Sequence, residues 1–154
     1  MPLLPPPVVG LAAAAVQRVM TRDSTPPSWL RATSAGGMLA ASGALAASAA
    51  GAFRRSGTTV EPFDPSRAAV LVTSGANQVS RNPMYVGMAG VLVAHALWRG
   101  SWQALLPVAG FVAYIDRVQV AAEERALRLR FGADYEAYVA AVPRWLDRRS
   151  VQRR

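Results

Sequence analysis

Long apolar stretches separated by arginine-bearing segments constrain the fold of this chain more than any other feature. Hydrophobic residues make up 52% of the 154 residues and charged residues only 17%, whereas a soluble domain carries about 25% charge. A bilayer core of about 30 Å is crossed by roughly 20 helical residues. Four stretches approach this length, from about Leu3 to Met20, Leu30 to Phe53, Met84 to Trp98 and Trp102 to Val118. We therefore expect an all-α, polytopic membrane helix bundle that forms a single domain over residues 1–154.

The connections between these stretches indicate how the spans are arranged. Only Arg99-Gly100-Ser101 separates the last two, and a turn this short joins two helices as an antiparallel hairpin. The first stretch lacks the basic start of a cleaved signal peptide, because residues 1–9 contain four prolines and no arginine. The second stretch is rich in Gly, Ala and Ser, which let membrane helices approach closely. We expect it to be buried against its neighbours.

Arginine supplies all the positive charge of the chain, and it is unevenly distributed. Thirteen of the 17 arginines lie between the second and third spans, at the end of the fourth or after it. The positive-inside rule then places both termini and residues 54–81 in the cytoplasm. We expect a multi-pass protein of a bacterial cytoplasmic membrane whose arginines meet membrane lipids. No basic stripe with interleaved aromatic residues stands apart from the apolar segments, so we expect no nucleic-acid partner.

Several kinds of site are disfavoured by composition. The chain has no cysteine, which excludes disulfides and thiolate chemistry. Its single histidine, His95, has no partners for a zinc site, so we expect no bound metal and a buried, hydrogen-bonded imidazole. Neither a G-x-G-x-x-G motif after a strand nor a P-loop is present, so a nucleotide-like cofactor would bind outside those frameworks.

Polar residues gather at the predicted cytoplasmic ends of the last two spans. Pro83 suits the first turn of a helix, Asn82 can cap that helix, and Tyr85 lies in the same turn. The hairpin returns Glu123-Glu124 to this face, where carboxylates near a bilayer tend to be paired or functional. Each group alone also fits an ordinary structural role, such as an interfacial tyrosine or an i, i+4 pair of Glu124 with Arg128. Together they predict a shared pocket.

The segment after the fourth span changes character. Its charged and apolar residues recur at helical spacing, and Phe131-Gly132 indicates a helix stop. Asp134 can cap a second short helix that Pro143 ends, which predicts short cytoplasmic helices followed by a basic tail over residues 147–154. Trp145 and Leu146 suit the membrane interface. Asp116 and Arg117 are expected to pair with each other or to line the pocket.

A set of motifs in this order resembles the isoprenylcysteine carboxyl methyltransferase and phospholipid methyltransferase superfamily of integral membrane enzymes. The motifs run over roughly residues 53–146, so residues 1–53 are expected to add two N-terminal spans and residues 54–146 a methyltransferase-like catalytic region. They are Gly57-Thr58-Thr59-Val60 with Pro62, Leu71-Val72-Thr73-Ser74-Gly75, Arg81-Asn82-Pro83-Met84-Tyr85-Val86-Gly87, Glu123-Glu124 with Leu127, Phe131-Gly132 with Tyr135 and Tyr138, and Val142-Pro143-Arg144.

The resemblance implies S-adenosyl-L-methionine as methyl donor, held at the cytoplasmic face. The implied cofactor-binding residues are Ala69, Val70, Leu71, Val72, Asn77, Asn82, Pro83, Met84, Tyr85 and Glu123, and the implied catalytic residues are Tyr85, Arg117 and Glu123. Two positions depart from the family pattern. Asn82 replaces the usual histidine and carries no proton near neutral pH. Gln119 replaces the arginine that binds the substrate carboxylate in the prenylcysteine enzymes, although Arg117 is nearby.

The expected reaction is methyl transfer to a lipophilic small molecule or lipid that enters from the bilayer. A carboxylate acceptor is ionised at neutral pH and needs no base, so a carboxylate or another easily ionised acceptor is favoured. Two alternatives remain open. Membrane sterol reductases, which use NADPH, share a similar C-terminal pattern but are usually longer. The departures at Asn82 and Gln119 also fit a non-catalytic membrane protein with a decayed site.

Overall fold

The computed structural model describes residues 4–56 and 70–151, and this part of the chain is helical without β-strands. Its long helices are α1 (Pro6–Met20), α2 (Trp29–Arg55), α3 (Pro83–Arg99), α4 (Leu105–Tyr114) and α5 (Ala121–Ala141). A π-helix, Ile115–Val120, joins α4 to α5, and short 3₁₀ helices span Gly75–Gln78, Trp102–Ala104 and Arg148–Ser150. The predicted all-α bundle is confirmed.

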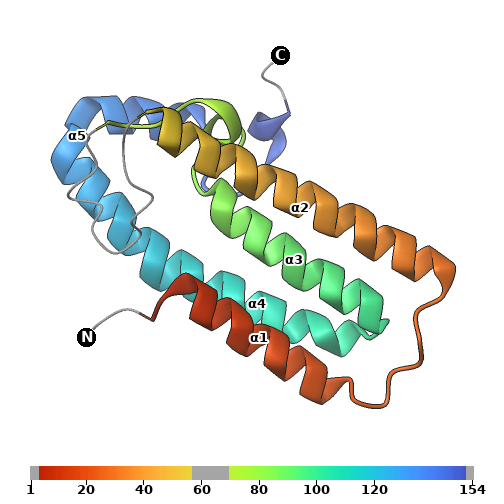
Figure 1. Ribbon diagram of the computed structural model, residues 1–154. Helices are drawn as coiled ribbons and strands as arrows, with labels where there is room; N and C mark the ends of the chain where they lie inside the picture. The colour runs from red at the N-terminus through yellow and green to blue at the C-terminus, as the bar shows by residue number, and fades with distance from the viewer. Residues whose placement is uncertain (1–3, 57–69, 152–154) are drawn as a thin grey trace.

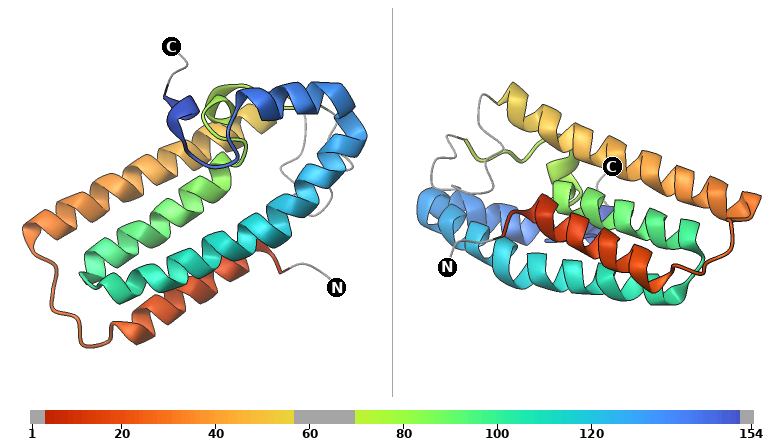
Figure 2. Two further views of the ribbon diagram at one scale, coloured as in Figure 1. Left: turned by 180° about the vertical axis from the view of Figure 1, so that it is seen from behind. Right: turned by 60° about the horizontal axis from the view of Figure 1, so that its bottom comes forward.

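The long helices run side by side along the bundle. Figures 1 and 2 show α2 lying along α3 and α1 lying along α4, while α5 continues beyond the bundle and folds back over one end. Within residues 4–56 and 70–151, two helices are able to cross a membrane by length and composition: α2 and the continuous rod Trp102–Ala141. Helix α1 is a shorter apolar helix. The number of membrane passes stays a prediction.

The predicted hairpin between the third and fourth stretches is present. Pro83 occupies the first turn of α3, where its missing N–H leaves no hydrogen bond unmade. Gly100 ends the helix with φ of 65°, a left-handed conformation that only glycine adopts without strain. The chain then reverses into α4, so the first turn of α3 and the first turn of α5 meet at the same end of the bundle.

The fourth span is longer than predicted, because the helix does not end near Val118. The π-helix carries it into α5, and the predicted stop at Gly132 is a kink with φ of 50° and ψ of −120°. Figure 1 shows α5 bending back there. The apolar part of the rod Trp102–Ala141 ends before the carboxylate pair Glu123-Glu124, where a charged run begins.

Glycine permits close packing of α2 against α3. A Cβ on Gly87 would lie 2.9 Å from the Ser42 carbonyl oxygen of α2, and a Cβ on Gly90 would lie 2.1 Å from Ser42 Oγ. In contrast, a Cβ on Gly36, Gly37 or Gly43 would have no neighbour within 4 Å. The expectation that the second span is buried against its neighbours holds for one face only: α3 covers that face of α2, and other small residues stay uncovered.

A buried glutamine ties α1 to the hairpin. Gln17, which has no exposed surface, donates from Nε2 to the Leu92 carbonyl at 2.9 Å and to the Ala104 carbonyl at 2.7 Å. Its Oε1 lies 2.8 Å from His95 Nδ1. His95 is half-buried and hydrogen-bonded, close to the sequence expectation. Nearby, Arg99 donates to the hydroxyl and the carbonyl of Thr21.

Gly87→Leu is expected to destabilise the bundle, because its side chain would meet the backbone of α2 and overpacking costs about 1–3 kcal/mol. Gly43→Leu is the matched control, since it brings the same gain in helix propensity but meets no neighbour. Thermal unfolding in detergent should give a lower Tm for Gly87→Leu than for Gly43→Leu. Equal Tm values for the two variants would contradict the close helix packing.

Candidate active site at one end of the bundle

The first turns of α3 and α5 bring Tyr85 and Glu123 into direct contact. The Tyr85 hydroxyl donates to Glu123 Oε1 at 2.6 Å, and Gln119 Nε2 of the π-helix donates to the same oxygen at 2.7 Å. Burial raises the pKa of Glu123, and the two hydrogen bonds oppose that effect. Two residues 38 positions apart in sequence thus form one polar centre, as the hairpin predicts.

The neighbouring carboxylate is the hub of a charged cluster. Glu124 is only 3% exposed, and its oxygens accept from Arg81 at 2.8 Å and from Arg144 at 2.9 and 2.7 Å. Arg128, four residues on, adds a longer contact of 3.4 Å. Burial alone would raise the pKa of Glu124, but hydrogen bonds from Arg144 and Arg81 outweigh it and lower the pKa. Glu124 therefore does not lie on a solvated helix face, although the pair with Arg128 exists.

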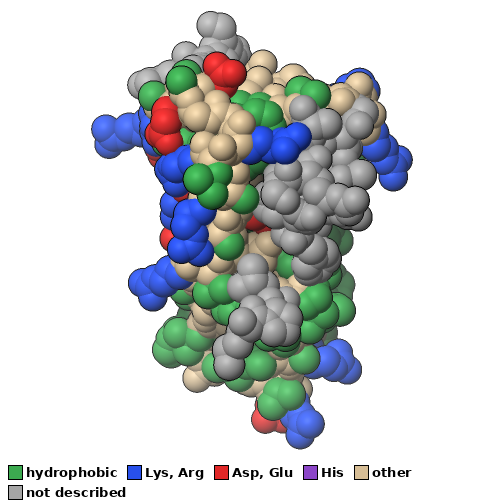
Figure 3. All heavy atoms as spheres, turned by 90° about the vertical axis from the view of Figure 1, so that its left-hand side faces the viewer, with side chains coloured by type: hydrophobic (Ala, Val, Ile, Leu, Met, Phe, Trp, Pro, Cys, Tyr) green, Lys and Arg blue, Asp and Glu red, His purple; other side chains and the backbone are tan. Residues whose placement is uncertain are grey.

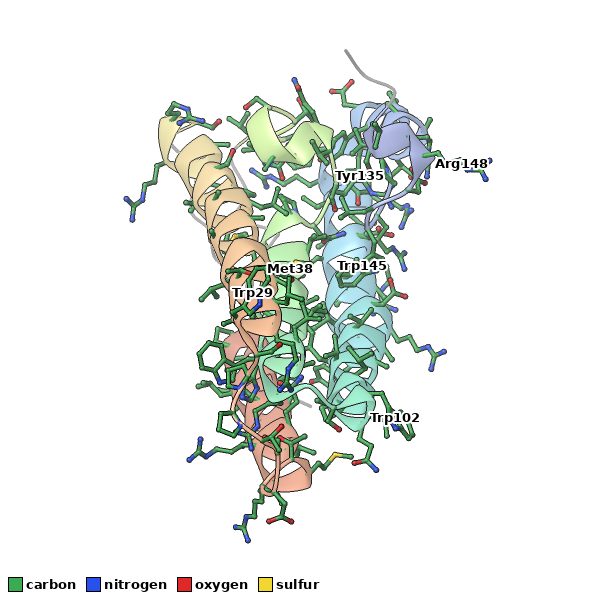
Figure 4. All side chains as sticks on the ribbon, turned by 90° about the vertical axis from the view of Figure 1, so that its right-hand side faces the viewer. Trp29, Met38, Trp102, Tyr135, Trp145 and Arg148 are labelled. Carbon is green, nitrogen blue, oxygen red and sulfur yellow. The ribbon has the colours of Figure 1, made fainter. Side chains whose placement is uncertain are left out.

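Arg144 extends this cluster to the π-helix. Its Nη1 lies 3.1 Å from Asp116 Oδ1, and Trp145 Nε1 donates to the same oxygen at 2.7 Å. Hydrogen bonds to Glu124 and then to Asp116 raise the pKa of Arg144. Trp145 packs against the core formed by α1, α3 and α4. Figure 4 shows Trp145 beside the continuous helical rod that starts with α4. Leu146 is exposed.

Arg117 stands apart from this cluster. Its side chain is exposed on the π-helix, and Asp116 is bound by Arg144 and Trp145 instead. The predicted pairing of Asp116 with Arg117 is therefore wrong. Figure 3 views the molecule from the side where α5 lies, and arginine side chains project along that face.

The N-terminus of α3 lacks the predicted side-chain cap. Asn82 occupies the capping position, but its Nδ2 donates to the Arg144 carbonyl at 3.0 Å. The first helical hydrogen bond runs from the Val86 N–H to the Asn82 carbonyl, and Pro83 has no N–H to satisfy. The backbone N–H groups of Met84 and Tyr85 therefore point out of the helix end with no capping side chain among the described residues.

The chain before α3 is anchored to the C-terminal segment. Arg81 donates from its backbone to the Pro143 carbonyl at 2.8 Å and from Nη1 to the Val142 carbonyl at 2.7 Å. Ser80 Oγ donates to the Arg144 carbonyl at 2.9 Å. The two segments close over the end of the bundle as one unit, although more than sixty residues separate them in sequence.

The remaining residues implied as cofactor-binding lie in the same region. Val70 is exposed, and Leu71 packs against the cluster of Tyr135, Tyr138 and Val142. Val72 and Asn77 are buried, and the Asn77 carbonyl accepts from the Tyr138 hydroxyl at 2.6 Å. Ala69 lies outside the described residues, as do Gly57-Thr58-Thr59-Val60 and Pro62.

Sequence reasoning missed the partners of the carboxylates. In the sequence, Gln119 stands out only as a departure from a family pattern, but in the structure it binds Glu123. Arg81 and Arg144 stand out only as parts of motifs, and both bind Glu124. One available signal was the i, i+4 spacing of Gln119 and Glu123, which places the two side chains on one helix face.

Two comparisons with known proteins give matches. The model of the phospholipid methyltransferase family matches residues 30–134. A protein of Haemophilus influenzae described as uncharacterized is 40% identical over 63 residues, which are 41% of this chain and the whole of that protein. No solved structure matches the chain.

Glu124→Gln is expected to lower the Tm strongly. Removing one partner of a buried ion pair costs about 3–5 kcal/mol, and Arg81 would keep a buried charge without its counter-ion. Glu136→Gln is the matched control on the same helix, because Glu136 is 56% exposed at its side chain and pairs with Arg128 at the surface. Exposed pairs contribute about 0–1 kcal/mol. Similar Tm losses in both variants, measured in detergent, would contradict the central role of Glu124.

The contribution of Glu124 to stability should disappear in acid. Its folded-state pKa lies below the ordinary value of 4.5, so its stabilising effect is fully present above that value and is lost as the pH falls through the folded-state pKa. The Tm difference between wild type and Glu124→Gln should therefore shrink as the pH falls from neutral to about 3. A difference that stays constant over this range would show that the ionised carboxylate is not what stabilises the fold.

Proposed function

Because this chain belongs to the phospholipid methyltransferase family, within a superfamily of integral membrane methyltransferases, we propose that it transfers a methyl group from S-adenosyl-L-methionine to a lipophilic acceptor. The acceptor enters from the bilayer, and the reaction takes place where α3 and α5 meet. The contact between Tyr85 and Glu123 beside the uncapped start of α3 carries this proposal.

The residues present fit this cofactor by their donor and acceptor chemistry. Helix N-termini favour anionic groups, and the N–H groups of Met84 and Tyr85 suit the carboxylate of an amino acid. The Glu123 carboxylate is an acceptor for an ammonium or hydroxyl group. S-Adenosyl-L-methionine carries a carboxylate, an ammonium group and a positive sulfonium. Its carboxylate would therefore find N–H donors in the first turn of α3, and its ammonium group would find a carboxylate in the first turn of α5.

The chain's own residues act by positioning. When bound, S-adenosyl-L-methionine supplies a methyl group that its sulfonium has already activated. The protein then gains rate mainly by holding the reacting groups in line. Tyr85 of α3 fixes the Glu123 carboxylate through a 2.6 Å hydrogen bond, and Gln119, one turn earlier on the same rod as Glu123, fixes the same oxygen. Trp145 and the anchored segment before α3 help to exclude water.

The acceptor is proposed to be a carboxylate or another group that ionises easily. Such an acceptor needs no base at neutral pH, and Asn82, where the family has a histidine, cannot take up a proton there. Arg117, which the resemblance implies as catalytic and which is exposed on the π-helix, stays the proposed partner of an acidic acceptor. Its accessibility suits a substrate that arrives from outside the bundle.

The proposed orientation places this end of the bundle in the cytoplasm. The last turn of α2 carries Arg54 and Arg55, and Figure 1 shows that end of α2 beside α5 and the C-terminal segment. Arginine next to a span marks its cytoplasmic end. A multi-pass protein with both termini in the cytoplasm follows, with the site on the side where S-adenosyl-L-methionine is made available.

Isothermal titration of the detergent-purified chain tests the cofactor. S-Adenosylhomocysteine should bind, and Glu123→Gln should weaken binding by about tenfold or more, because hydrogen bonds to charged groups contribute about 1.5–3 kcal/mol. Glu136→Gln, a surface carboxylate on the same helix, should leave the affinity unchanged.

NADPH in the same titration should not bind. Binding of NADPH in place of S-adenosylhomocysteine would favour a reductase. A folded protein that binds neither compound would favour a non-catalytic role and overturn the proposal.

A further inference from the structure

A groove of about 430 Å³ lies between α2 and α3, away from the candidate active site. Small and apolar side chains line most of it, including Ala32, Gly36 and Leu39 of α2 and Val91 and Trp98 of α3. His95 is the one ionisable residue in its lining. Since His95 follows Tyr85 by ten residues and a helix rises about 1.5 Å per residue, the groove lies about 15 Å along α3 from the Tyr85–Glu123 contact.

The protonation of His95 follows from the hydrogen bonds of Gln17. Two carbonyl oxygens, of Leu92 and Ala104, lie within 2.9 Å of one end of the Gln17 amide. Only an NH₂ group satisfies both, so the amide oxygen faces His95. An amide oxygen only accepts, and it lies 2.8 Å from His95 Nδ1. The Nδ1 nitrogen therefore carries the proton, and the other ring nitrogen, Nε2, is a lone-pair acceptor in the neutral imidazole.

The Nε2 nitrogen has no partner within the described residues, since Gln17 makes the one hydrogen bond of this side chain there, at Nδ1. The ring is half-buried at the wall of an otherwise apolar groove on the surface of the bundle. Among apolar neighbours, such a lone pair favours a ligand that brings a hydrogen-bond donor. The site thus combines one unsatisfied acceptor with a surface shaped for an apolar body.

We propose that this groove binds a lipophilic molecule whose hydroxyl group donates a hydrogen bond to His95 Nε2. A phenol or a long-chain alcohol has the required chemistry: one neutral donor at the end of an apolar body. An ammonium group would also donate, but the positive charges of Arg99 and Arg18 already act on His95, which favours a neutral donor. The small residues of α2, above all Gly36, leave room for the apolar part, because a Cβ there would have no neighbour within 4 Å.

The single histidine of the chain makes this proposal directly measurable. In protein labelled with ¹⁵N-histidine, the imidazole should give one pair of nitrogen signals, with Nδ1 protonated and Nε2 unprotonated. Titration with 4-nonylphenol should move the Nε2 signal in a saturable way, since a hydrogen bond to the lone pair changes its shielding. Nonylbenzene, which has the same apolar body without the hydroxyl, should not move it.

Two variants on α2 separate groove binding from general partition into the micelle. Gly36→Leu fills the groove and should abolish the saturable shift. Gly43→Leu lies on the same helix outside the lining, also in open space, and should retain the shift.

Four results would overturn the proposal. They are a protonated Nε2, no saturable shift with nonylphenol, equal shifts with both probes, and a shift that persists in Gly36→Leu. If in addition light scattering shows a dimer that Gly36→Leu alone dissociates, the groove belongs instead to a second copy of the chain. Binding at this groove is independent of the proposed methyl transfer, because S-adenosylhomocysteine titration does not report on it.

Discussion

The ionic contact of Glu124 with Arg81 and Arg144 is the interaction on which the rest of this end of the molecule depends. One buried carboxylate joins three separate parts of the chain: the entry to α3, the start of α5 and the segment after α5. Buried ion pairs are favourable only when their remaining lone pairs and protons are satisfied. Here Arg144 also binds Asp116, and Arg81 also binds two backbone carbonyls, while the buried Arg81 Nε has no hydrogen-bond partner among the described residues.

A second polar centre serves the opposite half of the bundle. Gln17 connects α1 to α3 and to the turn before α4, and Arg99 adds a contact to Thr21. In lipid, apolar surface alone gives helices little reason to associate, so close packing of small residues and interhelical hydrogen bonds take over. The contact of Gly87 with α2 and the two polar centres supply both kinds of interaction.

The charged cluster also determines how the candidate site is presented. The Arg144 carbonyl accepts the Asn82 side chain and so keeps it from capping α3. The N–H groups of the first turn then lie uncapped beside the Tyr85–Glu123 contact. Glu124 and Glu123 are thus adjacent carboxylates in different surroundings: arginines bind Glu124, and the neutral donors Tyr85 and Gln119 bind Glu123.

The sequence by itself determined the all-α class, the hairpin at Gly100, the break at Gly132 and the meeting of Tyr85 with Glu123. These follow from local rules: apolar length, the conformations open to glycine and proline, and the geometry of an antiparallel turn. Only the tertiary structure decided that Glu124 is buried, that Asp116 binds Arg144 rather than Arg117, and that α2 is covered on one face. Each of those outcomes depends on where the segment after α5 folds back, and that is set by contacts between residues distant in sequence, which no local pattern encodes.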